Sequence, residues 1–369
     1  MTTLIKERSI IVILLFLVAT AVLPFDKVLS VLLLASLLFF YRYPTLLKKV
    51  GLVFLVPLLS FFVNIFGQAN YKIFFLPIFV SCALALHQSK KVNIDEISVA
   101  LTIHAIIGIM FAMLANIGVA NLFCFSLIEK GFTDLYGPMG FSPTQQVYGS
   151  LCIINMIICY EKKNFSFSFF ISLVGLILTF NRCSLLFCGL LLAIYKRRLA
   201  LILLLCCIPI VIYFWDTIYE VFFSLSTMVS RDELRKGVEL SYWNSGDILV
   251  YIYGNGNIET SFRIAQQTEW GRLNVENGID FLFHSYGILG FVAYSLFSVY
   301  FIFTLYVKRV YHLIPIVMFY LFFEQWFTQE FVSSSFLLFI LTILLLANSK
   351  ELKTLEILKK IKKHENCNR

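Results

Sequence analysis

The chain has 369 residues, of which 59% are hydrophobic and 14% are charged, and its mean hydropathy is +0.84. This composition excludes a soluble protein, since ordinary soluble domains are about 45–50% apolar and about 25% charged. With about 17–25 apolar residues per membrane span, the length accommodates roughly a dozen helices and one modest loop domain, and leaves no room for a soluble nucleotide-binding domain. The net charge of +8 comes from short Lys and Arg clusters between apolar runs, so it indicates membrane topology and not nucleic-acid binding.

Apolar runs between polar breaks predict an all-α integral membrane protein with about twelve spans. The first run lacks a small-residue cleavage site and further spans follow at once, so we expect a retained helix and not a signal peptide. Twelve spans place both termini on the same face. In chain order, the predicted helices lie near 9–25, 28–41, 50–66, 73–86, 97–115, 147–160, 165–180, 183–195, 199–215, 278–306, 310–324 and 331–347.

The connections between these helices predict which face is cytoplasmic. Lys and Arg gather at alternate connections and in the tail, whereas the opposite face is richer in Asp and Glu. Since basic residues crowd the cytoplasmic side of membrane proteins, both termini are expected in the cytoplasm. The basic connections contain Lys6 and Arg8, Arg42 with Lys48 and Lys49, Lys90 and Lys91, Lys162 and Lys163, Lys196 to Arg198, and Lys308 with Arg309.

Two outer segments are too long to be simple connectors. They cover 116–146 and 216–277, and the second falls between the ninth and tenth predicted helices. Its mixture of aromatic and charged residues predicts an ordered polar cap and not a low-complexity linker. The expected organisation is a polytopic membrane domain over 1–348 and a basic cytoplasmic tail over 349–369. That tail is either an amphipathic helix on anionic lipid or a solvated segment.

The most informative stretch covers 276–290 and opens the tenth predicted helix. Glu276 and Asp280 stand one helical turn apart, on one face. Negative charge near a helix N-terminus is favoured by the helix dipole, so capping is one explanation. Capping accounts less easily for a second acid one turn deeper, and carboxylates within a membrane are usually functional.

This stretch resembles the signature of the O-antigen polymerase and O-antigen ligase superfamily. That signature is a His-(Asn, Ser or Gln) pair separated by nine residues from Gly-x-x-Gly. Asn277, Gly287 and Gly290 fit the spacing, and Glu276 occupies the His position.

Two further segments agree with the resemblance. Residues 179–182 are similar to the family's Thr-x-Ser-Arg segment, with Asn181 where Ser is common and with Arg182 at the outer end of a helix. Gly254 and Gly256 resemble a Gly-x-Gly that precedes the signature in the large loop. Together the matches cover about 179–290, and the first half of the chain matches in hydropathy alone.

The resemblance implies a GT-C-like, lipid-dependent glycosyltransferase in a bacterial inner membrane. The donor would be a glycan on undecaprenyl pyrophosphate, and an acceptor hydroxyl would attack its anomeric carbon. Arginine suits the leaving pyrophosphate because its planar fork binds phosphate oxygens and stays charged. Arg182 is the leading candidate, with an interfacial anchor as its alternative role. Four arginines of the large loop are further candidates: Arg231, Arg235, Arg263 and Arg272.

The acceptor proton requires a base, and Glu276 is the candidate. Asp280 would orient the acceptor hydroxyl or a clamping arginine. His284 aligns less well with the signature and is expected to be a hydrogen-bonded core residue. An outer cluster over 324–330 is a candidate rim for the acceptor site. No Asp-x-Asp or paired His occurs, so we expect no metal or cofactor.

Three functions remain open at this stage. A repeat-unit polymerase would join two undecaprenyl-pyrophosphate-linked glycans, with a chain-length regulator and a flippase as further partners. A ligase would transfer the finished glycan to lipid A core, and Glu276 at the His position argues mildly against it. A lipid-linked oligosaccharide flippase is the third, although flippases need charges within a central cavity.

Overall fold

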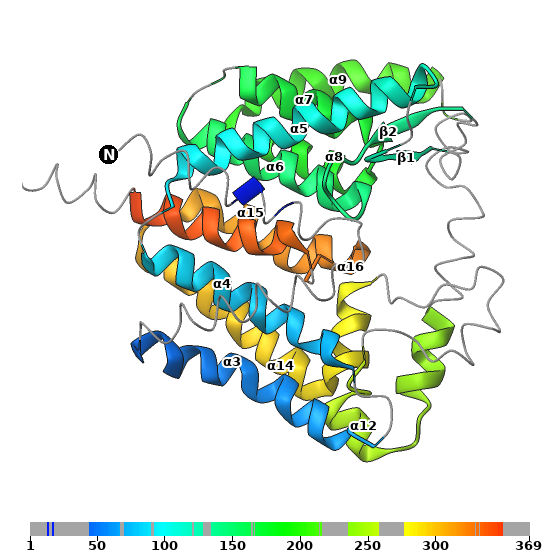
Figure 1. Ribbon diagram of the computed structural model, residues 1–369. Helices are drawn as coiled ribbons and strands as arrows, with labels where there is room; N and C mark the ends of the chain where they lie inside the picture. The colour runs from blue at the N-terminus through cyan, green and yellow to red at the C-terminus, as the bar shows by residue number, and fades with distance from the viewer. Residues whose placement is uncertain are drawn as a thin grey trace, which may run out of the picture.

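A computed structural model describes residues 44–66, 70–89, 92–119, 122–127, 134–163, 167–213, 235–257, 277–328 and 333–349, with residues 13, 14, 17, 165, 215, 330 and 331. This part of the chain is mostly helical (Figure 1). The predicted helix 28–41, most of 9–25 and the tail beyond 349 lie outside the described residues.

The helices follow one another with short connections over most of the described chain. In order they are α3 (Pro44–Val63), η1 (Tyr71–Phe74), α4 (Phe75–Ser89), α5 (Ile94–Asn116), α6 (Gln145–Glu161), α7 (Phe167–Leu178), α8 (Arg182–Tyr195), α9 (Arg197–Tyr213), η3 (Glu239–Trp243), α12 (Ile248–Tyr253) and α14 (Gly278–Val307). The last part contains η4 (Tyr311–Leu313), α15 (Ile314–Met318), η5 (Phe319–Glu324), α16 (Gln325–Phe327) and a final helix, Ser334–Ser349.

Three described helices are long and apolar enough to cross a membrane, which supports a multi-pass membrane protein. They are Tyr71–Gln88, Ile94–Asn116 and Gly278–Val307. The sequence-based expectation that every apolar run is a full span is wrong. At 1.5 Å per residue, the 12 residues of α7 and the 14 of α8 rise about 18 and 21 Å, short of a hydrocarbon core of about 30 Å.

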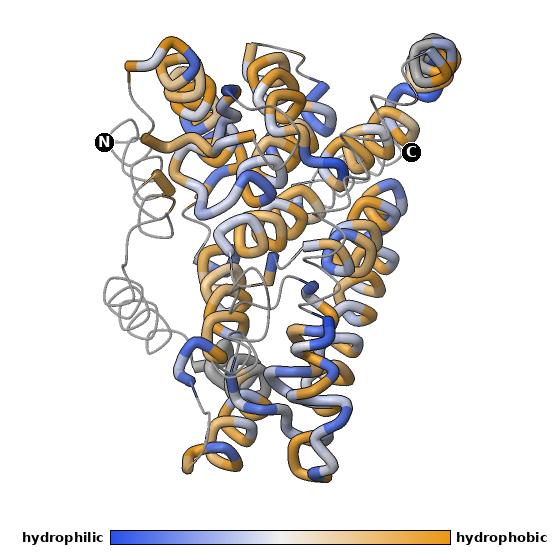
Figure 2. The backbone as a smooth tube through the Cα atoms, turned by 90° about the vertical axis from the view of Figure 1, so that its right-hand side faces the viewer, coloured by the Kyte–Doolittle hydropathy of each residue, from blue (hydrophilic) through white to orange (hydrophobic). Residues whose placement is uncertain are grey.

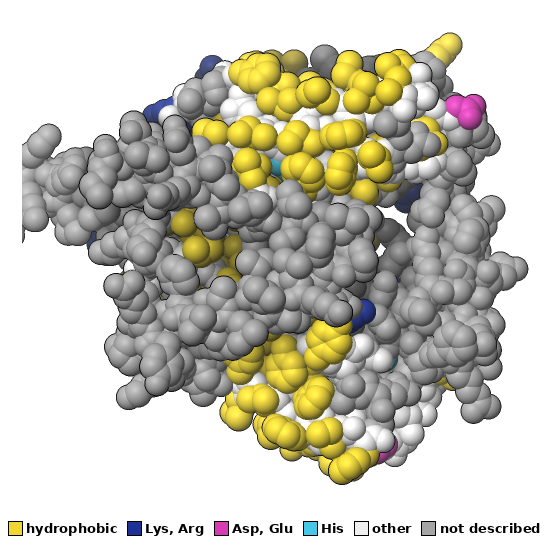
Figure 3. Space-filling view, viewed as in Figure 1, with side chains coloured by type: hydrophobic (Ala, Val, Ile, Leu, Met, Phe, Trp, Pro, Cys, Tyr) yellow, Lys and Arg dark blue, Asp and Glu magenta, His cyan; other side chains and the backbone are white. Residues whose placement is uncertain are grey.

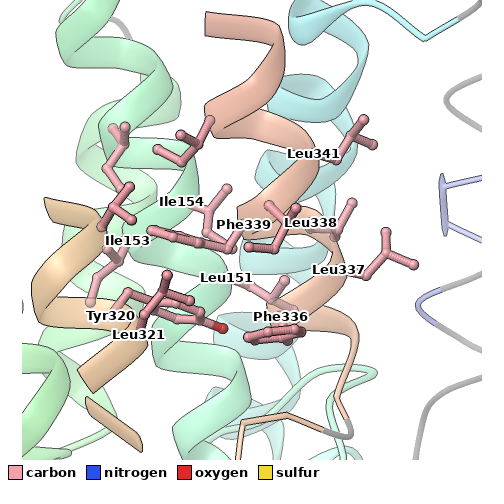
Figure 4. Packing of buried hydrophobic residues seen from close by; sticks show 14 of the residues in the cluster. Leu151, Ile153, Ile154, Tyr320, Leu321, Phe336, Leu337, Leu338, Phe339 and Leu341 are labelled. Carbon is pink, nitrogen blue, oxygen red and sulfur yellow. The ribbon is translucent and has the colours of Figure 1, made fainter. Parts of the chain in front are cut away.

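Helix α6 forms the centre of the bundle. Every residue from Val147 to Tyr160 is buried, and α5, α7 and α8 pack around it. Figure 4 shows Leu151 and Ile154 of α6 among the aromatic rings of Tyr320 and the final helix. The outer helices instead expose apolar side chains, including Phe170 of α7 at 57% (Figure 3). Such an apolar exterior suits contact with lipid.

A buried polar network holds α5, α6 and α7 together. The Asn155 side chain is fully buried, and its Nδ2 donates to Thr102 Oγ1 at 3.0 Å, Ser168 Oγ at 3.0 Å and Ser172 Oγ at 2.8 Å. Its Oδ1 accepts from Ser98 Oγ at 2.6 Å. With its amide engaged on both sides, Asn155 acts as polar glue between helices.

Polar contacts join helix ends that adjoin some of the connections predicted to be cytoplasmic. His312 Nε2 lies 2.8 Å from Glu161 Oε1, and Tyr195 OH donates to the same oxygen at 2.5 Å. Asn348 Nδ2 lies 2.5 Å from His87 Nε2. The first two contacts join the ends of α6 and α8 to η4, and the third joins the end of α4 to the end of the final helix. Figure 2 colours the described residues by hydropathy, and hydrophobic residues dominate their helices.

The outer segment 116–146 contains a two-stranded antiparallel sheet, so the fold is not purely helical. Strands β1 (Cys124–Ser126) and β2 (Tyr136–Pro138) pair beside the end of α5 (Figure 1). Asn116 fastens β2, accepting from Tyr136 N at 2.8 Å. The following turn reaches His104, whose Nε2 accepts from Phe141 N at 3.1 Å. His104 lies twelve residues, or about 18 Å, before Asn116 on α5. Helix α6 therefore begins beside the middle of α5 and not beside its C-terminal end.

Candidate functional site

Asn277 marks the start of α14 and caps it. Its Oδ1 accepts from Ile279 N at 2.8 Å and from Asp280 N at 3.2 Å, which satisfies two amides that a helix start leaves free. Gly278 follows at a position with little space, because a Cβ there would lie 2.8 Å from the Gln325 carbonyl oxygen. Two residues of the predicted stretch thus have defined structural roles.

Helix α14 confirms the bounds of the helix predicted over 278–306, but it has a kink at Gly287 that was not predicted. Gly287 has φ 68° and ψ −165°, a conformation that belongs almost solely to glycine. The first turns, up to Tyr286, run at an angle to the remainder (Figure 1). Asp280 therefore lies on a separate short segment and not simply one turn deeper along a continuous span. Gly290 has a different role, since a Cβ there would meet Tyr286 Cβ at 2.1 Å.

The loop over 254–257 docks into this break. Asn255 N donates to the His284 carbonyl at 2.7 Å, and Ser285 Oγ donates to the Asn257 carbonyl at 2.8 Å. Gly254 has φ 73° and ψ −176°, and a Cβ on it would lie 2.5 Å from the Ser285 carbonyl carbon. The two glycine-containing motifs that the sequence placed in separate segments are therefore in direct contact.

Helix α3 completes the joint through residues that the sequence analysis missed. Ser60 Oγ donates to the Ser285 carbonyl at 2.8 Å, and Asn64 Nδ2 donates to the Gly254 carbonyl at 2.8 Å. Gly256 lies against Asn64, where a Cβ would approach the Asn64 Cβ to 2.9 Å. Polar side chains four residues apart in an apolar helix were the available signal, because such residues share one helix face.

The docked loop is supported from the large outer segment. Asn255 Nδ2 donates to the Ser241 carbonyl at 2.8 Å, and Tyr242 OH donates to the Tyr251 carbonyl at 2.9 Å. Burial, reinforced by Tyr251, raises the pKa of Tyr242 to about 12. Tyr242 therefore stays protonated and remains a donor at neutral pH. Within this segment the structure describes residues 235–257, which include η3 and α12.

His284 is a buried core residue, as expected from its position. Its side chain is fully buried, and its Nδ1 lies 3.1 Å from the Asn257 carbonyl oxygen. Because a carbonyl oxygen accepts, Nδ1 carries the hydrogen, and Nε2 is left as a buried acceptor without a described partner. The ring therefore fixes the 254–257 loop.

Asp280 faces a basic side chain from the large outer segment. Arg235 Nε lies 4.0 Å from Asp280 Oδ2, and the side chains are 59% and 22% exposed respectively. This is a long, solvent-screened ion pair that contributes little to stability. Among the predicted loop arginines, Arg235 is thus brought beside a predicted site residue. Glu276, Arg231, Arg263 and Arg272 lie outside the described residues.

Arg182 opens α8 and is half-buried. The preceding residues set that helix start: Asn181 Oδ1 accepts from Cys183 N at 3.2 Å, and Asn181 Nδ2 donates to Ser184 Oγ at 2.8 Å. Thr179 Oγ1 accepts from Asn181 N at 3.2 Å. The Thr-x-Asn-Arg segment is therefore a turn and cap that presents Arg182 at the first helical position.

Contacts through α6 connect the starts of α8 and α14. A Cβ on Gly149 of α6 would lie 2.6 Å from Ser184 Oγ of α8. The next residue, Ser150, donates to Glu324 Oε1 at 2.9 Å. Gln325 follows, and its carbonyl oxygen abuts Gly278 of α14. The helix starts that carry Arg182 and Asp280 therefore flank the same segment, although no direct contact joins these two side chains.

The predicted acceptor rim over 324–330 is wrong for most of its described residues. Glu324 and Gln325 are fully buried and Glu330 is 1% exposed, whereas Trp326 is 50% exposed. The acidic side chains point into the protein, where α6 and the final helix cover them. Hydropathy did not predict this burial, because a hydropathy scale assigns every carboxylate the same polar value whether it is buried or exposed.

No described group of three or more His, Cys, Asp or Glu side chains is arranged to hold a metal ion. Comparison with known proteins found no matching family model, curated protein or solved structure.

Proposed function

We propose that this protein polymerises undecaprenyl-pyrophosphate-linked oligosaccharide repeat units into O-antigen or a related surface polysaccharide, on the periplasmic face of a bacterial inner membrane. The observation that carries the proposal is the joint between the 254–257 loop and the break at Gly287. Both glycine-containing motifs on which the family resemblance rests fit together there, and Asn277 and Asp280 open the same helix.

The proposed chemistry transfers a glycan without a sugar nucleotide. An acceptor hydroxyl oxygen forms a bond with the donor's anomeric carbon, and the bond from that carbon to the pyrophosphate oxygen breaks. The hydroxyl proton passes to a base, and undecaprenyl pyrophosphate leaves. Positive charge aimed at the leaving oxygen and a base near the acceptor lower the barrier.

Arg182 and Glu276 are assigned these two tasks. Arg182 stands at a helix start, beside the segment that also contacts the start of α14. Glu276 directly precedes the capping residue Asn277, and Asp280 with Arg235 lies one turn further on. Arg231, Arg263 and Arg272 are proposed to complete the pyrophosphate clamp. The reaction is proposed to need no metal or cofactor.

The partners follow from the reaction. Donor and acceptor are both lipid-linked glycans, delivered by a flippase, and a chain-length regulator sets the extent of polymerisation. A nucleic acid has no place in this scheme. We propose that both termini are cytoplasmic, because Lys and Arg gather at alternate connections of the chain.

The test is complementation of a strain that lacks the chain. Arg182→Ala and Glu276→Gln are expected to abolish chain extension while the protein stays inserted and abundant. Arg198→Ala and Glu239→Gln are the matched controls, because both side chains are exposed and lie outside the proposed site. Polysaccharide length on gels and protein level on blots are the measurements.

The deletion strain itself separates the alternatives. Loss of a polymerase leaves lipopolysaccharide with a single repeat, whereas loss of a ligase accumulates undecaprenyl-linked polymer, and loss of a flippase leaves repeat units on the cytoplasmic face. Normal long polymer in Arg182→Ala or Glu276→Gln would remove that residue from the mechanism.

A further inference from the structure

Two buried glutamates, Glu324 and Glu330, lie between α6 and the final helix. Glu324 ends η5 and is 0% exposed, and Glu330 lies in the connection before the final helix and is 1% exposed. Isolated ionised carboxylates are expensive to bury, so such a pair needs compensation from its neighbours.

Hydroxyl groups compensate the two carboxylates unequally. Glu330 Oε2 accepts from Ser333 Oγ at 3.3 Å and from Ser335 Oγ in a short contact. Glu324 Oε1 accepts from Ser150 Oγ at 2.9 Å, and Ser150 also interacts with Glu330. Glu324 Oε2 is buried and has no hydrogen-bond partner among the described residues. Glu330 is thus surrounded by donors, whereas half of the Glu324 carboxyl group is bare.

No described basic side chain balances the charge, because neither glutamate forms an ion pair with a described residue. Tyr320 interacts electrostatically with both carboxylates, and a tyrosine is neutral at pH 7. The elements packed around the pair carry further titratable or charged side chains, among them Tyr320 on η5, Tyr148 and Cys152 on α6, Arg182 and Cys183 on α8, and Asp280, His284, Tyr286 and Tyr294 on α14.

A proton fits this site better than a metal cation. A hydroxyl has one hydrogen to donate, and Ser150 and Ser333 also lie within donating distance of the backbone carbonyl oxygens of Gln146 and Glu330, so these hydroxyls do not fully compensate two negative charges. Among the described residues, no third His, Cys, Asp or Glu side chain joins the pair to hold a metal ion. Two carboxylates that share one site cannot both ionise readily. Burial raises the pKa of the Glu330 carboxyl, although the hydroxyls of Ser335, Ser150 and Ser333 act in the opposite direction.

We propose that Glu324 and Glu330 form a proton-binding site that holds one proton at neutral pH, carried on Oε2 of Glu324, while Glu330 stays ionised among the serine hydroxyls. The site goes beyond the proposed glycosyl transfer and does not depend on it. It ties the start of α6 to the connection that abuts Gly278 at the start of α14.

Infrared spectroscopy of the purified full-length protein tests this directly. At pH 7 the wild type should show the C=O stretch of a protonated carboxyl group, shifted down in D₂O. Glu324→Gln should remove this band. Glu96→Gln is the matched control, because Glu96 is also a buried glutamate, 5% exposed, but accepts from the Asn93 backbone amide at 3.1 Å. The band should survive this control.

A pH series adds an independent readout. The folded site binds a proton that an unfolded chain has lost at neutral pH, so stability should fall as the pH rises through the pH at which the band disappears. In Glu324→Gln, the thermal midpoint should lose this component of its pH dependence. If that variant does not fold, Ser150→Ala should shift the frequency of the band, because it removes the hydrogen bond to Glu324 Oε1.

Two results would overturn the proposal. The first is a wild type without a protonated carboxyl band at pH 7, or a band that survives Glu324→Gln. The second is a wild type that lacks this band and has a higher thermal midpoint in NaCl or CaCl₂ than in choline chloride, while Glu324→Gln shows no such difference between the salts. That second result would assign the pair to a metal cation.

Discussion

Substitution of Gly254 or Gly287 by alanine should disrupt the contacts between the 254–257 loop and the kink of α14. Both glycines combine a positive φ with an extended ψ, a region that other residues enter at a cost of about 1–3 kcal/mol. An added Cβ on Gly287 would also lie 2.4 Å from the Ile252 carbonyl oxygen. Because the atoms that it meets belong to backbone, the clash cannot be relieved by rotating a side chain.

The magnitude follows from the bonds that separation breaks. The loop would lose the Asn255 amide bond to His284 and the Ser285 hydroxyl bond to Asn257, each contributing about 0.5–1.5 kcal/mol. With the conformational cost, the free energy of unfolding should fall by about 2–6 kcal/mol in either variant. The double variant should cost less than the sum, because both substitutions break the same joint.

Two glycines provide controls for denaturant titration of the purified protein in mixed micelles. Gly118 has φ 77° with nothing within 4 Å of an added Cβ, so Gly118→Ala should retain only a conformational cost of about 1–2 kcal/mol. Gly189 lies within α8 with open space around it, and alanine there should be neutral or stabilising by up to about 1 kcal/mol. Wild-type stability in Gly254→Ala and Gly287→Ala would refute the docking argument.

Three further predictions concern packing, charge and topology. Asn155→Ala should lower the free energy of unfolding by about 1–3 kcal/mol in the same titration, because it strands hydroxyls of α5 and α7, and an unchanged value would mean that the network contributes nothing. Arg235→Ala should change stability by less than about 1 kcal/mol because the ion pair is long and exposed. If Arg235 acts beside Asp280 in the proposed site, the variant should also shorten the polymer on gels, and unaltered polymer length would exclude Arg235 from that site. Reporter fusions within 220–270 should be active only with a reporter that works outside the cytoplasm, and fusions after Arg198 should behave oppositely. An inward-facing 220–270 would invert the topology.

The membrane character and many of the helix positions could be predicted from the sequence. Hydropathy is a local property, so the runs near 147–160 and 183–195 correspond closely to α6 and α8. The family resemblance, and not hydropathy, drew attention to Asn277 and to the glycines of the 254–290 region. Cap residues and glycines are readable because their effect acts within a few residues of the backbone.

Tertiary contacts decided the features that an apolar run cannot show. The run through α14 gives no sign of a break, since Gly287 adopts its conformation to fit a loop 33 residues earlier in the chain. Likewise, the sequence predicts Glu324 and Glu330 to be exposed charges. In the structure both are buried, with Ser150 of α6 donating to Glu324 and the final helix packing over the pair. Sequence patterns report how each segment partitions between water and lipid, whereas burial of a carboxylate depends on which distant segments pack against it.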